Sequence, residues 1–407
     1  MTSLTRFFGS GFKNAIAVIR SKYSRSISNT YSEDCVRIIS YRADFITIAR
    51  LKKNWQQFAA GIGAYPGGFE GKGIVMCAGG IKYFTCAWVN INMLRKLGCS
   101  LPIELWYNGK ELTPEIIGQL KELNVTCKNS EDYGGAEMEN YALKPFAIIK
   151  SSFKEVMFLD ADNNCVKEPA YLFESSAYKK LGTIFWPDFW KTEKENSIWK
   201  IIGSQDYDSM EQESGQILIN KEQCWKELNL CLYFNTQRKS YYKMLLGDKD
   251  TFKFAWMALG TPYHMIPTPV AHCGYRNQEN GHFLGLCMVQ HDEQGRVLFL
   301  HRNMIKWDIT KNNELVWQQI VRYKDNAKSK KVTLSGINGM YFQAITGDVE
   351  YLDFNQLFGN YEEQCLEILR NLRTSYFYME FLQENYFSYF RPYYPAKISN
   401  AVTNETN

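Results

Sequence analysis

Two aspartates one residue apart, Asp160 and Asp162, directly follow the apolar run 156–159. Neighbouring carboxylates repel each other, and burying them without a cationic partner costs free energy. Mg²⁺ or Mn²⁺ would satisfy both, because these ions prefer carboxylate oxygens and complete their coordination with water and substrate phosphates. The spacing therefore predicts a metal site that neutralises a diphosphate leaving group. The alternative is that the aspartates only cap backbone N–H groups in a turn.

A third metal ligand has to come from a distant part of the chain. The sequence contains five histidines. His301 closes the apolar segment 297–300, so we expect it to be the ligand, with His272 and His291 as alternatives. The competing interpretation of each is a structural hydrogen-bonding residue.

The segment before the aspartates alternates strand and helix patterns. We expect strands near 73–80, 101–109, 125–129 and 155–160, and helices near 85–98, 113–123 and 142–152. This order predicts an α/β fold with a largely parallel sheet, which binds ligands beyond the carboxyl ends of its strands. Gly79 and Gly80 lie at one such end and the aspartate pair lies at another. Two independent signals therefore indicate the same edge of the sheet.

The remaining composition limits the classes of function. The 407 residues are 45% hydrophobic and carry a net charge of +4 without a long basic run, so we expect no nucleic acid partner. Eleven cysteines without paired spacing predict reduced, buried thiols. Beyond residue 309 the chain has helical character, with a Tyr/Phe stripe at 366–387 that we attribute to packing. The last ten residues are predicted to be disordered.

The N-terminal 28 residues include five basic side chains and no acid. They are interpreted either as a targeting segment that contacts a membrane surface peripherally or as a frayed first helix. No stretch reaches the roughly 18 consecutive apolar residues of a membrane span. We therefore expect a soluble protein of the cytoplasm.

Six segments in order, GIVMCAGG, ALKPFAIIKSSFKEVMFLDADN, GTIFWPDFW, ESGQILIN, GDKDTFKFAW and FLHRN, resemble the fungal alpha-mannosyltransferases of glycosyltransferase family 71. The resemblance covers about 71–308 and implies a GT-A fold, with a Rossmann-like mixed sheet flanked by helices. A helical extension (1–70) would precede this domain, and a mostly helical region (309–407) would follow it. Members of the family have an N-terminal membrane anchor, so the Golgi or secretory lumen is the alternative location.

The resemblance also implies the chemistry: retaining transfer of mannose from GDP-mannose to an alpha-mannoside or glycan acceptor, in alpha-1,2 or alpha-1,3 linkage, with Mn²⁺ or Mg²⁺. Residue by residue, it implies donor binding by Gly79, Gly80, Lys144, Asp160 and Asp248. The metal would be held by Asp160, Asp162 and His301. Glu213 and Asp250 are the candidates for the catalytic carboxylate. The sugar or acceptor contacts would be Trp186, Asp188, Trp190 and Gln216.

Plainer alternatives exist for these motifs. WPDFW is also compatible with a packed aromatic turn, GDKD with a polar helix start, and ESGQ with a loop that leads into a strand. Three other functions stay open: a GT-A transferase with a UDP-sugar donor, an inactive carbohydrate-binding relative, and a nucleotidyltransferase. The last usually has a stronger glycine-rich phosphate loop than Gly79 and Gly80 provide.

Overall fold

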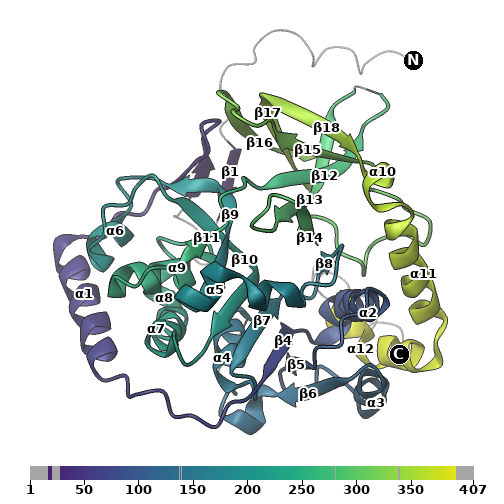
Figure 1. The fold of residues 1–407 in the computed structure, drawn as a ribbon, viewed down its shortest axis with the longest axis horizontal. Coiled ribbons are helices and arrows are strands. Elements are labelled where there is room, and N and C mark those ends of the chain that lie inside the picture. The colour runs from purple at the N-terminus through teal and green to yellow at the C-terminus, as the bar shows by residue number, and fades with distance from the viewer. Residues whose placement is uncertain are drawn as a thin grey trace, which may run out of the picture.

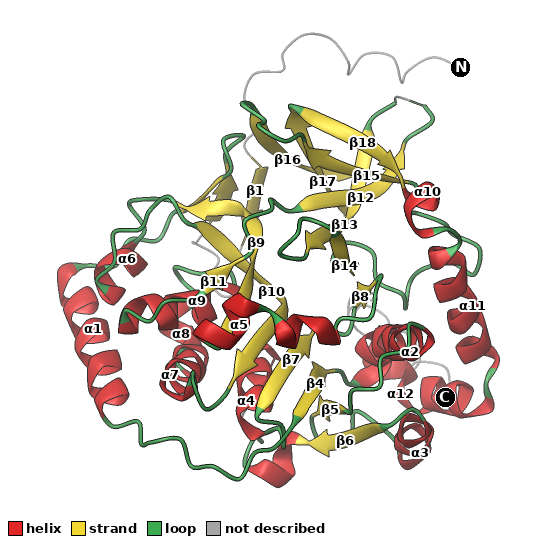
Figure 2. Cartoon of the chain, in the orientation of Figure 1, coloured by secondary structure: helices red, strands yellow, loops and turns green. Residues whose placement is uncertain are grey.

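The computed structural model describes residues 17–20, 28–136, 138, 140–279, 281–337 and 340–390. A central sheet with the order β1-β2-β3-β9-β10-β7-β4-β5-β6, and β11 beside β9, spans the molecule (Figures 1 and 2). Its strands are β1 (Ala17–Arg20), β2 (Ser28–Tyr31), β3 (Val36–Ile39), β4 (Lys72–Cys77), β5 (Ile103–Tyr107), β6 (Val125–Asn129), β7 (Glu155–Leu159), β9 (Thr183–Thr192), β10 (Met210–Asn220) and β11 (His264–Met265).

The half of this sheet formed by β7, β4, β5 and β6 is parallel, whereas β10 runs antiparallel between β7 and β9. Every strand and helix predicted between residues 73 and 160 is present. Thr113 is the N-cap of helix α3 (Pro114–Glu122), as predicted: its side chain accepts a hydrogen bond from the N–H of Ile116. The predicted α/β class, with a mixed sheet flanked by helices, is confirmed.

Helices cover both faces of the central sheet. One apolar core lies under α1, α4, α6, α7 and α9, and another lies under α2, α3, α11 and α12. The helices are α1 (Phe45–Ala60), α2 (Gly80–Lys96), α3 (Pro114–Glu122), α4 (Leu143–Lys150), α5 (Ser176–Leu181), α6 (Ser197–Ile202), α7 (Trp225–Thr236), α8 (Arg238–Tyr241), α9 (Lys249–Leu259), α10 (Phe354–Phe358), α11 (Tyr361–Thr374) and α12 (Tyr376–Phe390), with 3-10 turns η1 (Ser130–Tyr133), η2 (Asn140–Ala142) and η3 (Ala170–Glu174).

The region after residue 309 is less helical than predicted. It contributes four strands to a second, antiparallel sheet with the order β16-β17-β13-β12-β15-β18, to which β14 and β8 attach. In β16, exposed Lys331 and Thr333 alternate with buried Val332, a period of two that the longer helical pattern downstream obscured. The strands are β8 (Asn163–Cys165), β12 (Ala271–Arg276), β13 (Phe283–His291), β14 (Val297–His301), β15 (Gln319–Tyr323), β16 (Lys330–Ile337), β17 (Met340–Gly347) and β18 (Val349–Asp353).

The predicted helical extension before residue 70 is likewise only partly helical. β2 and β3 form a hairpin, and β3 pairs in parallel with β9 at the edge of the central sheet. Cys35 takes a positive φ of 61° in the connecting turn, a feature that residue periodicity does not reveal. Most of the basic N-terminus, to which the membrane-surface prediction refers, and the tail predicted to be disordered lie outside the described residues.

Two further sequence expectations concern helices and thiols. No helix among the described residues is both long and apolar enough to cross a membrane. All eleven cysteines are free, and eight of them are buried.

In the Tyr/Phe stripe, Tyr378 and Phe381 pack into the core against α2, and the hydroxyl of Tyr378 is 2.6 Å from the Thr85 hydroxyl. The stripe therefore serves packing, as predicted.

Lys221, at the end of β10, is a buried cation that the sequence did not single out. Its Nζ donates to the carbonyls of Ile149 and Ser151 and lies 3.4 Å from the ring centroid of Phe69. No carboxylate forms an ion pair with it in the part of the chain that the structure describes. Burial lowers the pKa of Lys221 to about 7, although Glu104 opposes the shift.

Lys221→Met should flatten the pH dependence of stability. An unfolded lysine has a pKa of about 10.4, so between pH 7 and 10 the unfolded chain binds more protons and the free energy of unfolding rises with pH. In the variant, we expect the free energy of unfolding to rise less steeply with pH, by roughly 1 kcal/mol per pH unit. Urea unfolding at pH 7, 8 and 9 measures this slope. Replacement of the exposed Lys200 is the control for charge removal. An unchanged slope in the Lys221 variant would contradict the prediction.

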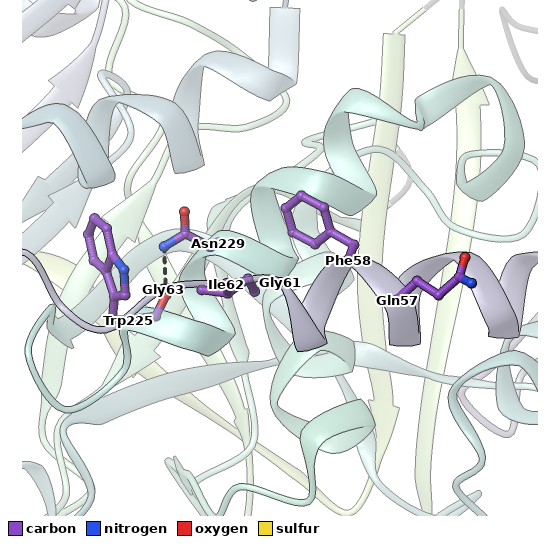
Figure 3. Close-up of a pocket in the computed structure, with 7 residues that line it drawn as sticks. All are labelled: Gln57, Phe58, Gly61, Ile62, Gly63, Trp225 and Asn229. Carbon is purple, nitrogen blue, oxygen red and sulfur yellow. Dashed lines mark hydrogen bonds between the residues drawn. The ribbon is translucent and has the colours of Figure 1, made fainter.

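A shallow surface pocket lies between the end of α1 and the start of α7 (Figure 3). It is lined by neutral residues, among them Phe58, Trp225 and Asn229, whose amide donates to the Trp225 carbonyl at 2.8 Å. Because β10 is antiparallel to β7 and precedes α7, Trp225 lies at the opposite edge of the sheet from Asp160. The pocket is therefore separate from the site described next.

Candidate metal centre

Three strands bring the acidic and histidine candidates together at the carboxyl edge of β7. Asp160 follows β7 directly, and its N–H donates to the carbonyl of Gly215 in β10 at 2.8 Å. β14 ends at His301, which lies opposite Asn163 of the short strand β8. The turn that holds the aspartates is thus fixed by main-chain contacts on both sides.

Asp160, Asp162, Glu213 and His301 form an acidic cluster, and all of them except Asp162 belong to a group with the spacing of a cation site. One ligand atom each of Asp160, Glu213 and His301 lie within 4.8 Å of one another. Nδ1 of His301 is 3.1 Å from Oε1 of Glu213, and its Nε2 is 3.3 Å from Oδ1 of Asp162. The side chain of Asp160 is 28% exposed, whereas those of the other three are at most 10% exposed, so the cluster opens at Asp160. The donor set, rich in carboxylate oxygens, fits Mn²⁺ or Mg²⁺.

The charges of the acidic cluster partly compensate one another. Burial alone would raise the pKa of Glu213, but His301 and Lys144 lower it below its ordinary value. Burial alone would lower the pKa of His301, but Glu213 and Asp160 raise it above its ordinary value. A divalent cation would displace the imidazole proton, because a metal ligand must be deprotonated.

Lys144 supplies a fixed positive charge next to the acidic cluster. Its Nζ is 3.2 Å from Oδ1 of Asp160 and 3.2 Å from Oδ2 of Asp248. It also donates to the carbonyl and to the hydroxyl of Ser214, both at 2.9 Å. Burial opposes its charge, yet Asp160, Asp248 and Glu213 raise the pKa of Lys144 above its ordinary value. Lys144, Asp160 and Asp248, predicted as donor contacts, therefore lie together.

Gly215 allows Glu213 and His301 to approach each other. A Cβ atom at this position would lie 2.7 Å from Oε1 of Glu213 and 2.7 Å from Nδ1 of His301, closer than real Cβ contacts. The Gly215 N–H also donates to Oε1 of Glu213 at 2.6 Å, and Gln216 donates to Oε2 at 2.6 Å. The ESGQ segment is thus part of strand β10 and fixes the Glu213 carboxylate.

Gly215→Ala should therefore disturb the acidic cluster with little effect on the rest of the fold. The added methyl group forces Glu213 and His301 apart, and we expect affinity for Mn²⁺ to fall about tenfold to hundredfold, as for other residues that orient metal ligands. Titration calorimetry with Mn²⁺ measures the affinity, and circular dichroism checks the fold. Gly118→Ala, in α3 with no atom within 4 Å of the added Cβ, is the control. Unchanged Mn²⁺ affinity in the Gly215 variant would contradict the expected crowding.

Lys306 is a second cation of the site, and sequence reasoning missed it. Its Nζ forms an ion pair with Oδ2 of Asp162. The signal was available, since Lys306 follows His301 by five residues within the same segment, but it stands outside the FLHRN motif. Two lysines from different elements thus flank the aspartate pair.

Arg302 anchors the segment that holds His301 and Lys306. Its guanidinium is fully buried, donates to Oε1 of Glu362 in α11 at 3.1 Å and to the Thr310 hydroxyl at 2.8 Å, and lies 3.8 Å from the Trp307 ring centroid. The carboxylate of Glu362 also accepts the N–H groups of residues 316 and 317. A contact with helix α11 therefore fixes the segment that carries His301 and Lys306.

Gly79 and Gly80 lie at the carboxyl end of β4, the strand next to β7, and begin α2. Gly80 has a φ of +62°, and a Cβ on Gly79 would collide with the carboxylate of Glu111. Asn90 of α2 donates to the carbonyl of Asn163 in the aspartate turn at 2.9 Å. The glycine turn and the aspartate turn are thus neighbours on one edge, as predicted.

Trp186 and Trp190 do not form a sugar platform, and that prediction is wrong. Trp186 is 1% exposed and donates from Nε1 to the His291 carbonyl, while Trp190 is 3% exposed with its ring 4.4 Å from that of Tyr31. Both rings pack in the core because WPDFW lies within β9, a strand in the middle of the sheet.

The remaining predicted contacts are also buried. Gln216 is fully buried and bonded to Glu213, so it positions the carboxylate and offers nothing to an acceptor. Asp250 has no exposed surface, which contradicts its role as a catalytic carboxylate. It belongs, together with Asp188, to a buried ion network that we define as Arg37, Asp188, Glu211, Lys249 and Asp250. In this network Asp188 is 2.7 Å from Lys249, so it too is not part of an exposed platform.

The alternative histidine ligands lie elsewhere. His272 is 1% exposed, with Nε2 3.2 Å from Oε1 of Gln343, and His291 is fully buried in β13. Burial lowers the pKa of His272 to about 3 and that of His291 to about 4, which keeps both neutral. Of the three histidines considered, only His301 lies in the acidic cluster.

The fold and site together define an α/β protein with a candidate divalent-metal centre at the carboxyl end of β7. A family model described as "Mannosyltransferase putative" matches residues 71–213 and 208–292. The chain belongs to this mannosyltransferase family. The family assignment made from the six sequence segments is therefore confirmed.

Curated relatives and solved structures show further similarity. The chain is 29% identical over 294 residues to alpha-1,2-mannosyltransferase MNN5 of Saccharomyces cerevisiae, covering 55% of this chain and 49% of the relative. It is 27% identical over 340 residues to alpha-1,2-mannosyltransferase MNN21 of Candida albicans, covering 67% and 51%. The chain thus spans about half the length of these relatives.

Among solved structures, the galactosyltransferase LgtC in complex with donor and acceptor sugar analogs matches with a TM-score of 0.34 and 14% identity, over 47% of this chain and 72% of that one. Mouse xyloside xylosyltransferase 1 matches with a TM-score of 0.35 and 15% identity, over 48% and 84%.

Proposed function

We propose that this protein is a metal-dependent, retaining glycosyltransferase that transfers mannose from GDP-mannose to an alpha-mannoside or glycan acceptor. The observation that supports this best is the juxtaposition of the acidic cluster with Lys144. Carboxylates and an imidazole for a divalent cation lie next to a buried lysine, at the edge where open α/β sheets bind nucleotides. The names of the relatives MNN5 and MNN21 support mannose as the sugar and alpha-1,2 as the first linkage to test, with alpha-1,3 second.

The side chains of the site have different roles in breaking the bond between the sugar and the diphosphate of the donor. A divalent cation held by Asp160, Asp162 and His301 would supply the charge that stabilises the departing diphosphate. Lys144 and Lys306 add positive charge from fixed positions, so little reorganisation is needed as negative charge develops. Gly79 and Gly80 let the main chain come close to the nucleotide at the start of α2.

Glu213 is the remaining candidate for a carboxylate that acts on the sugar. Transfer with retention by double displacement needs a nucleophilic oxygen on the face of the sugar opposite the leaving group. The lowered pKa of Glu213 keeps it ionised, and hydrogen bonds from Gly215 and Gln216 fix both of its oxygens. Glu213 therefore either contacts the transferred sugar or completes the coordination of the cation. Glu213→Gln separates the two roles, because only the second requires loss of Mn²⁺ affinity.

The decisive test is transfer by the purified chain. Incubation with GDP-mannose, Mn²⁺ and a panel of alpha-mannosides, followed by NMR of the product, should show a new alpha linkage. Parallel assays with UDP-glucose and UDP-N-acetylglucosamine measure released UDP against released GDP. Faster release of UDP with product formation would reassign the donor. Acceptor binding without turnover of any donor would indicate an inactive carbohydrate-binding protein instead.

A further inference from the structure

Two tyrosines beside the acidic cluster have rings that are about half exposed. Tyr83 is 43% exposed and lies in the first turn of α2, just after Gly79 and Gly80. Tyr141 is 50% exposed and lies in η2, just before the helix that holds Lys144. Neither residue belongs to a motif recognised in the sequence.

Tyr83 borders the cluster on the side of Asp162. The Nζ atom of Lys306, which pairs with Asp162, is 5.7 Å from the centroid of the Tyr83 ring. Burial, with smaller contributions from Tyr141 and Asp160, raises the pKa of Tyr83 to about 12. The ring therefore lies beside the cation that pairs with Asp162.

Tyr141 borders the cluster on the side of Lys144. A Cβ atom built on Gly247 would lie 3.5 Å from the Tyr141 ring, and the next residue, Asp248, is 3.2 Å from Nζ of Lys144. The two tyrosines belong to opposite faces of the sheet, because α2 packs against α11 and α12 whereas α4 packs against α7. They thus flank the carboxyl edge of β4 and β7 from its two sides.

We propose that Tyr83 and Tyr141 bind the base of the nucleotide donor by stacking on it. Between β4 and β7 the strand order reverses, and open α/β sheets bind ligands in the crevice at that point. A nucleobase has an aromatic face that stacks on tyrosine whatever its hydrogen-bonding edge. The inference rests on the proposed function, since it identifies the residues that would hold the donor of that reaction.

The test is binding of nucleoside diphosphates to the full chain, measured by titration calorimetry. Three probes are used, each with Mn²⁺: GDP, UDP and inorganic diphosphate, which has no base. Tyr83→Ala and Tyr141→Ala should each weaken binding of the preferred nucleotide by about tenfold to hundredfold. Binding of inorganic diphosphate should change less than about twofold, because the phosphate contacts remain. Tyr83→Phe and Tyr141→Phe keep the stacking face and should bind within about threefold of the unchanged chain.

Tyr351→Ala is the matched control, since Tyr351 is 45% exposed but lies on β18 in the second sheet. Unchanged nucleotide affinity in either alanine variant would contradict the proposal that both tyrosines stack on the base. Equal losses for nucleotide and inorganic diphosphate overturn it as well, because they mean that the substitution disturbed the acidic cluster. If the unchanged chain binds neither GDP nor UDP, the proposed function itself fails. If it binds one of them and the alanine variants bind equally well, only this inference fails.

Discussion

Asp160→Asn and Asp162→Asn should each lower the rate of sugar transfer by about a thousandfold. A bound cation contributes several kcal/mol to stabilisation of a leaving group, and each 1.36 kcal/mol corresponds to a factor of ten. The two aspartates lie in one turn held by main-chain bonds, so removing one charge leaves the backbone arrangement intact. Release of GDP in the presence of acceptor gives the rate, and calorimetry with Mn²⁺ should show a parallel loss of metal affinity.

Asp325→Asn, at an exposed position in a turn of the second sheet, is the control and should keep full activity. Asp160 contacts Lys144 and His301, and Asp162 contacts Lys306 and His301, so thermal unfolding has to confirm that each variant still folds. Full Mn²⁺-dependent transfer by either variant would remove the basis of the metal assignment. Loss of transfer with unchanged Mn²⁺ binding would assign the aspartate to the sugar instead.

Arg37→Leu should lower the free energy of unfolding by about 3–5 kcal/mol, the usual effect of breaking a buried ion pair. The Arg37 guanidinium donates from Nε to both oxygens of Glu211, at 2.7 and 2.9 Å, and neither residue has exposed surface. Its loss leaves the buried ion network with three carboxylates and a single cation, Lys249. Urea unfolding at pH 7 measures the change.

Arg322→Leu provides the comparison. Arg322 pairs with Glu350 at 2.6 Å, but their side chains are 38% and 36% exposed. Exposed pairs contribute about 0–1 kcal/mol, so this variant should be nearly as stable as the unchanged chain. Similar effects of the two arginine substitutions would show that burial does not strengthen the Arg37 contact.

The parallel half of the sheet was predictable because its signals are local. Thr113 and Pro114 mark a helix start, and the apolar runs of β4 and β7 are typical of strands covered on both faces. The strand ends then placed the Gly79–Gly80 turn and Asp160 on one edge without any knowledge of tertiary structure. Lys144 entered through the family resemblance, and the structure places it on that edge too.

The burial of side chains in β9 and α9 could not be predicted, because partners that are distant in the sequence determine it. Trp190 packs against Tyr31, more than a hundred residues earlier, and Asp250 meets Arg37 at a similar separation. Nothing near WPDFW or GDKD in the sequence indicates that these side chains point into the interior. Lys306 was missed although it lies close to His301 in the sequence, because a single lysine in a loop is ordinarily a solvated surface residue.

The contact between Arg302 and Glu362 determines how much of the chain a working fragment must include. The family match stops at residue 292, which suggests that a shorter domain would suffice. A chain that ends at residue 292 lacks His301. A chain that ends at residue 308 keeps His301, but the buried guanidinium of Arg302 then loses the carboxylate of Glu362. We therefore expect the smallest fragment that keeps the candidate metal centre to include Glu362 and the start of helix α11.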